Sequence, residues 1–101
     1  MYAEFVSTAL VADDGEPSTS EELLERVVTC RARMLRSAGR LDQPAEERLA
    51  REVEYDTALI RLCTALDIAA DPSRFAHPHQ ERARLEQALA DAGVPMTREM
   101  A

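Results

Sequence analysis

The sequence contains no lysine, no asparagine and no tryptophan, and only two tyrosines and two phenylalanines. All twelve basic residues are therefore arginine. Without lysine, the chain has no residue for Schiff-base chemistry and no lysine of the kind that phosphate loops use. With so few aromatic residues, the core must be built from Leu, Val, Ala and Met. This composition is typical of helical bundles and not of sheets.

Glycine and cysteine are also scarce, with three Gly and two Cys in 101 residues. No glycine-rich phosphate loop, Cys-x-x-Cys motif or Gly-x-Ser-x-Gly elbow is present. Cys30 and Cys63 lie at helical core spacing, so we expect two reduced thiols that behave as small apolar residues. The pair His77 and His79 lacks the further ligands that a structural zinc site needs, and Pro78 fits a helix start. We therefore predict no catalytic residues, no metal site and no cofactor.

The formal net charge is −7, and the arginines are interleaved with Asp and Glu. A nucleic-acid-binding surface usually carries a basic patch, so the charge pattern argues against direct nucleic-acid binding. It also disfavours anionic membranes. No apolar run approaches the roughly 20 residues of a membrane span, and the first residues lack the positive charge of a secretory signal. We expect a cytoplasmic location.

Helical periodicity and capping signals predict a single domain, residues 1–101, of the all-α class. Ser18 with Glu21, or Thr19 with Glu22, fits a capping box for the first long helix. Gly39 and Gly93 are placed to end helices. We expect a small antiparallel three-helix bundle with an N-terminal segment 1–17, helices over 18–39, 42–68 and 78–93, a short helical turn over 71–76, and a frayed tail over 95–101. Within 1–17 we prefer a short helix to a strand, because no second strand-like run exists to pair with it.

Two carboxylates interrupt the apolar face of the 42–68 helix. Glu52 and Asp56 lie one turn apart inside an apolar arc that covers about half of the helix circumference, which is wider than one partner helix requires. On the 18–39 helix, Arg31 likewise falls inside the apolar arc. Because an unpaired buried charge is costly, buried charges are usually matched. The positions relative to the connecting loop predict an Arg31–Glu52 contact first and an Arg26–Asp56 contact second.

The function prediction follows from the width of that arc. The 78–93 helix offers few large side chains to cover it, so we expect part of it to stay exposed as an interaction patch: Tyr55, Leu59, Leu62 and Leu66. A non-enzymatic protein–protein interaction or self-association module is the favoured interpretation, with a protein partner or a homodimer. The alternative is a small-ligand binding protein or enzyme with a charged site at Arg31, Glu52 and Asp56.

Overall fold

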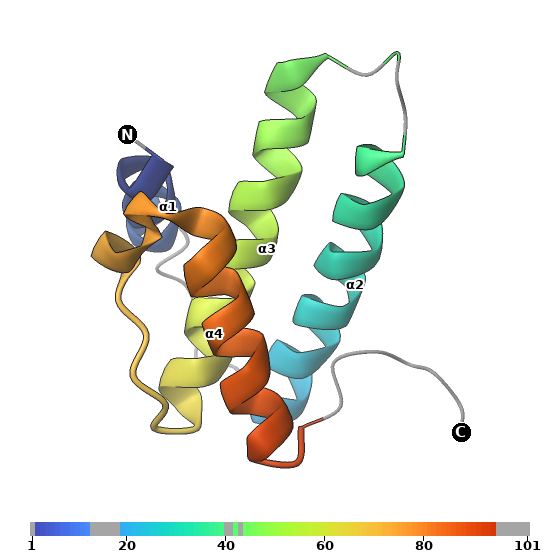
Figure 1. Cartoon of the computed structure of the whole chain (residues 1–101). Coiled ribbons are helices and arrows are strands. Elements are labelled where there is room, and N and C mark those ends of the chain that lie inside the picture. The colour runs from blue at the N-terminus through green and yellow to red at the C-terminus, as the bar shows by residue number, and fades with distance from the viewer. Residues whose placement is uncertain (1, 13–18, 40–41, 43, 95–101) are drawn as a thin grey trace.

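The computed structural model describes residues 2–12, 19–39, 42 and 44–94. These residues form an all-α fold without strands, as the composition predicts. Figure 1 shows the elements in chain order: α1 (Tyr2–Ala12), α2 (Ser20–Ala38), α3 (Ala45–Ala65), the 3-10 helix η1 (Pro72–Ala76) and α4 (Pro78–Asp91). The expected frayed tail, 95–101, and most of the loop between α1 and α2 lie outside the described residues.

The capping box predicted before the first long helix is present at the second of the two expected positions. The Glu22 amide donates to Thr19 Oγ1 at 3.1 Å, and the Thr19 amide donates to Glu22 Oε1 at 3.0 Å. Two amides at the start of α2 are thereby satisfied, and the acidic first turn suits the positive end of the helix dipole. The other candidate, Ser18, lies outside the described residues.

Two other expectations, the short helical turn over 71–76 and the N-terminal helix, also match the structure. The side chain of Asp71 accepts a hydrogen bond from the Ser73 amide at 2.9 Å and so starts η1, which lies inside the predicted turn 71–76. The segment before residue 13 contains α1, so the preference for a helix over a strand is correct.

The helices α3 and α4 end in the same backbone motif. At the end of α4, Gly93 has a φ of 81°, the Val94 amide donates to the Leu89 carbonyl, and the Gly93 amide donates to the Ala90 carbonyl. These bonds define a Schellman motif. At the end of α3, the Ile68 amide donates to the Cys63 carbonyl at 2.8 Å and the Asp67 amide to Thr64 at 3.1 Å. There Asp67 takes the left-handed position, with a φ of 63°.

Replacing Asp67 by Gly is expected to stabilise the protein by roughly 0.5–1 kcal/mol, because glycine adopts a positive φ without the steric cost of a Cβ. Gly93→Ala should cost about 1 kcal/mol or more, because a Cβ is strained at this positive φ even though it would meet no neighbouring atom. Chemical denaturation of both variants measures the two effects. A loss of stability in Asp67→Gly would show that the aspartate side chain contributes more than its backbone strain costs.

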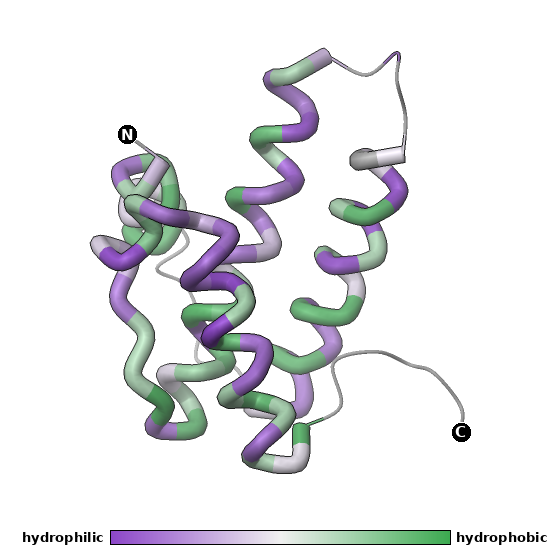
Figure 2. Tube along the Cα trace, viewed as in Figure 1, coloured by the Kyte–Doolittle hydropathy of each residue, from purple (hydrophilic) through white to green (hydrophobic). Residues whose placement is uncertain are grey.

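The helix α3 is the centre of the molecule. It runs antiparallel to α2, and it also contacts α1 and α4, while η1 packs against α1 and α4 (Figure 1). Hydrophobic residues occur along the trace of each of these elements (Figure 2). The buried apolar side chains come from every element: Val6, Leu23, Val27, Cys30, Tyr55, Ala58, Leu59, Ile60, Leu62, Cys63, Phe75, Leu85 and Leu89.

Candidate functional site

The carboxylate of Asp56 is fully buried and is held from two other helices. Arg82 of α4 donates from Nε to Asp56 Oδ1 and from Nη2 to Asp56 Oδ2, both at 2.7 Å. The hydroxyl of Tyr2, from α1, donates to Oδ2. Glu52 lies at the edge of the cluster, 3.4 Å from Arg82 Nη2. A planar guanidinium that donates two parallel hydrogen bonds is the arrangement that suits a buried carboxylate best.

Burial and hydrogen bonding have opposite effects on the pKa of the buried carboxylate in this cluster. Burial raises the pKa of Asp56, and hydrogen bonds from Arg82 and Tyr2 to the ionised form offset part of that rise. Burial lowers the pKa of Arg82, but the carboxylate of Asp56 more than compensates, so the net shift of that pKa is upward. Burial, and then the hydrogen bond to Asp56, raises the pKa of Tyr2. The hydroxyl of Tyr2 therefore stays protonated and can donate to the carboxylate.

The partners predicted for these charges are wrong. Glu52 and Asp56 share Arg82 of α4, so Glu52 does not pair with Arg31, and Asp56 does not pair with Arg26. Arg31 instead lies 3.9 Å from Glu86 of α4. The physical reason is that α4 supplies the guanidinium closest to the buried carboxylate, with both donors in bidentate geometry, and α2 does not.

A signal for Arg82 is present in the sequence. Arg82 precedes Leu85 by three residues and Leu89 by seven, so it lies on the same stripe of α4 as these two leucines. Both leucines are fully buried, and Arg82 is 9% exposed. A charged residue within an apolar stripe is a signal that the folded protein supplies it with a partner of opposite charge. Nothing in the sequence pattern points to Tyr2 as a donor, because α1 meets α3 only through the tertiary fold.

Replacing Arg82 by Met should destabilise the protein by about 3–5 kcal/mol, since it leaves the charge of Asp56 buried without its main partner. Adding Asp56→Asn to Arg82→Met should restore part of that loss, because position 56 then carries no buried charge and the amide can still accept from Tyr2. Thermal and chemical unfolding of the single and double variants measure both effects.

The matched control for this experiment is Arg31→Met. Arg31 and Glu86 are both about one-third exposed and 3.9 Å apart, so this change should cost less than about 1 kcal/mol. If Arg31→Met destabilised the protein as much as Arg82→Met, the central role given to the Arg82–Asp56 contact would be wrong.

The predicted interaction patch is mostly covered. Tyr55, Leu59 and Leu62 are at most 1% exposed, and only Leu66 reaches 36%. The expectation that this side of α3 stays open is therefore wrong. The helices α1 and α4 both pack on α3, so the wide apolar arc has more partners than the sequence indicated. The hydroxyl of Tyr55 donates to Glu86, and burial followed by this hydrogen bond raises the pKa of Tyr55.

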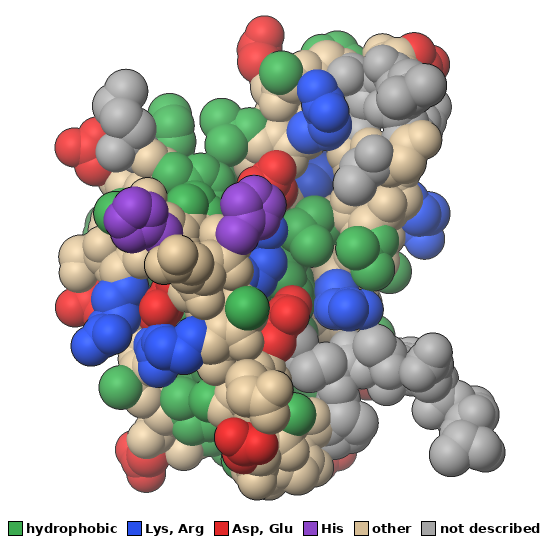
Figure 3. All heavy atoms as spheres, in the orientation of Figure 1, with side chains coloured by type: hydrophobic (Ala, Val, Ile, Leu, Met, Phe, Trp, Pro, Cys, Tyr) green, Lys and Arg blue, Asp and Glu red, His purple; other side chains and the backbone are tan. Residues whose placement is uncertain are grey.

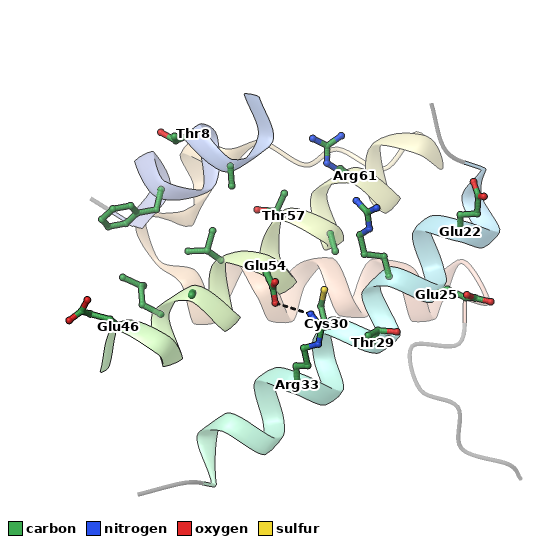
Figure 4. Close-up of a pocket in the computed structure, with 17 residues that line it drawn as sticks. Thr8, Glu22, Glu25, Thr29, Cys30, Arg33, Glu46, Glu54, Thr57 and Arg61 are labelled. Carbon is green, nitrogen blue, oxygen red and sulfur yellow. Dashed lines mark ion pairs between the residues drawn. The ribbon is translucent and has the colours of Figure 1, made fainter. Parts of the chain in front are cut away.

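A separate groove lies between α1, α2 and α3 (Figure 4). Its volume is about 1090 Å³. Its floor is apolar, formed by side chains that include the half-exposed Phe5 and the 36% exposed Leu49. Seventeen residues line it: Phe5, Thr8 and Ala9 of α1; Glu22, Glu25, Arg26, Thr29, Cys30 and Arg33 of α2; and Glu46, Leu49, Ala50, Val53, Glu54, Thr57, Ala58 and Arg61 of α3.

The charges at the rim of this groove are partly matched within the chain. Arg33 lies 3.6 Å from Glu54, which also meets Arg51 at 3.4 Å. Arg61 donates from Nη2 to the carbonyl of Leu10 at 2.8 Å and so ties α1 to α3 along one wall. The rim is therefore a set of engaged arginines and several carboxylates around an apolar floor.

Apart from arginines, the titratable side chains that line the groove are four carboxylates and one thiol. Its lining has no histidine. Its one thiol, Cys30, is free and buried, and burial raises the pKa of Cys30, which leaves little thiolate at neutral pH. Cys63 is also free and buried, and burial raises its pKa to about 11. Both cysteines are unpaired core residues, as expected.

The segment His77-Pro78-His79 opens a helix, as its sequence suggests. His77 occupies the cap position and Pro78 begins α4. Across the described ranges, no group of three or more His, Cys, Asp or Glu is arranged to hold a metal ion. Within the same ranges, no helix combines the length and the apolar character needed to cross a membrane.

Comparisons with protein-family models, with curated proteins and with solved structures found no match for this chain.

Thr57 lines the groove and carries a polar atom without a partner. Its side chain is 7% exposed, and its Oγ1 is buried with no hydrogen bond. A buried hydroxyl that has lost its water and gained no partner costs about 1–3 kcal/mol. The unpaired hydroxyl of Thr57 belongs to a side chain that lines the groove (Figure 4).

Replacing Thr57 by Val keeps the shape and removes the hydroxyl, so it should raise stability by about 1 kcal/mol. Thr57→Ser keeps the hydroxyl and removes the buried methyl group, so it should lower stability by a similar amount. Urea unfolding of both variants measures this. A destabilised Thr57→Val would show that the hydroxyl has a hydrogen-bond partner in solution.

Proposed function

We propose that this chain is a non-enzymatic protein–protein interaction module, and that the groove between α1, α2 and α3 is its docking surface. The observation that supports this proposal is an apolar floor left open between three helices. Phe5 and Leu49 are large apolar side chains of that floor, and they are 51% and 36% exposed. Apolar surface that a folded chain leaves in a concave position is a common feature of partner sites.

The alternative, a small-ligand site or enzyme at Arg31, Glu52 and Asp56, has less support. Asp56 is fully buried, with Arg82 and Tyr2 occupying its oxygens. Arg31 contacts a different carboxylate. A ligand would have to displace a bidentate arginine contact to reach the carboxylate, which is costly in a dry site.

A protein partner and a homodimer both remain within this proposal. Direct nucleic-acid binding is disfavoured by the net charge of −7. On the face drawn in Figure 3, arginine and acidic side chains are interspersed, and no block of one sign stands out. We also propose a cytoplasmic location, because two free, buried cysteines fit a reducing compartment.

For the scaffold that presents the groove, we propose an antiparallel bundle of α2, α3 and α4. The support for it is the polar contact among Arg31 of α2, Tyr55 of α3 and Glu86 of α4, which joins the three helices. The helix α1 then forms the outer wall of the groove, held to α3 through Tyr2 and Arg61.

Site-specific photo-crosslinking in the cells that make this protein tests the function. A benzophenone side chain at Leu49 should capture the same partner repeatedly, whereas one at Leu35 should not. Leu35 is a suitable control because it is 50% exposed but does not line the groove. Mass spectrometry identifies the captured chain, and purified components then confirm direct binding. Equal capture from both positions, or no capture at Leu49, would contradict the proposal.

A further inference from the structure

We infer that the groove binds one amphipathic helix of a partner protein, with arginine or lysine residues flanking the apolar stripe of that helix. This inference rests on the proposed function and specifies the partner's chemistry. An amphipathic helix that lays its apolar face into a groove is a recurrent mode of peptide recognition. Two observations select it here: the shape of the floor and the distribution of charge at the rim.

The length of the floor and the sizes of its side chains suit a bound helix. Along α3, the lining residues extend from Glu46 to Arg61, which is roughly 22 Å at 1.5 Å per residue. A partner helix of about 15 residues has the same length. Short side chains at Ala50 and Ala58 leave room for the larger side chains of a partner, and Leu49 adds an exposed apolar contact. Figure 4 shows lining side chains along α3, with further lining side chains from α1 and α2 beside them.

The charge at the rim favours a cationic partner. Two rim arginines already contact acceptors within the chain: Arg33 forms an ion pair with Glu54, and Arg61 donates to the carbonyl of Leu10. Arg26 also interacts within the chain. Exposed carboxylates lie at both ends. Glu46 belongs to the first turn of α3 and Glu22 to the first turn of α2. Because α2 and α3 are antiparallel, these two residues lie at opposite ends of the groove (Figure 4).

The same charges disfavour a second copy of this chain as the occupant. Each copy carries a net charge of −7, so two copies would repel each other as they approached. A partner with positive charge at both flanks of its apolar stripe would instead be attracted to Glu22 and Glu46. Electrostatic complementarity of this kind mainly increases the association rate and the specificity.

The test uses a fluorescein-labelled synthetic helix of leucine and lysine, about 18 residues or roughly 27 Å long, with leucine at i, i+3, i+4 and i+7. Fluorescence anisotropy should show saturable binding to the purified chain. A scrambled peptide of the same composition has the same charge but no apolar stripe, and it should bind at least about tenfold more weakly. A leucine–glutamate helix, which keeps the stripe and reverses the charge, should also bind at least about tenfold more weakly.

Matched variants of the chain locate the binding. Leu49→Arg should weaken binding of the leucine–lysine helix by at least about tenfold, while Leu35→Arg, the same change outside the groove, should alter it little. The double variant Glu22→Gln with Glu46→Gln should weaken binding several-fold and reduce its dependence on salt. Glu21→Gln, next to Glu22 but outside the lining, should do neither.

Four results would overturn the inference. Equal affinity for the scrambled peptide, or equal loss in Leu49→Arg and Leu35→Arg, would show binding by charge alone. A dimer in sedimentation velocity that Leu49→Arg dissociates, without peptide binding, would make a second copy the occupant and leave the proposed function standing. Binding of the dye ANS in the groove without peptide binding would indicate a small-molecule occupant. The proposed function itself fails only if, in addition, Leu49 captures no protein in the crosslinking experiment.

Discussion

The contact between Arg82 and Asp56 is the interaction on which the arrangement of the helices depends. Asp56 lies in the fully buried part of α3, where an ionised carboxylate is stable only with close donors. Arg82 supplies two of them from α4, and Tyr2 supplies a third from α1. Three helices therefore converge on one side chain. The positions of α1 and α4 on α3 are specified by hydrogen-bond geometry, which apolar packing alone does not specify as narrowly.

This constraint also shapes the groove. At one end of α1, Tyr2 is held by Asp56 and packs near Phe75, with ring centroids 6.3 Å apart. Near the other end, the carbonyl of Leu10 accepts from Arg61. With both ends of α1 attached to α3 by polar contacts, α1 forms a wall beside α3 and leaves the floor between α1 and α2 open. The position of α1 that leaves the groove open is thus held in part by the buried carboxylate of Asp56.

The features that could be predicted from the sequence are those encoded within a few residues. Thr19 with Glu22, Asp71 and Gly93 each act through hydrogen bonds to backbone groups close in the chain, and each was identifiable. The partners of Glu52 and Asp56 were not identifiable with the same rules. These partners depend on which helix packs against which. The prediction used positions relative to the loop between α2 and α3, so it could find partners only on α2. The wide arc of α3 indicated more than one neighbour, but not that the packing of both α1 and α4 on α3 would leave Tyr55 buried.

The shortage of large side chains explains why the groove exists at all. All the buried residues of α3 lie in its second half, from Tyr55 to Cys63. The first half contributes Ala50 and the exposed Leu49, and the facing part of α1 contributes Ala9. With no tryptophan and only four aromatic residues in the chain, little remains to fill the space between α1, α2 and this half of α3. An alanine-rich, arginine-rich composition can thus close one core around Asp56 and Arg82 while leaving a second apolar surface open. The unpaired hydroxyl of Thr57 lies at the boundary between the two.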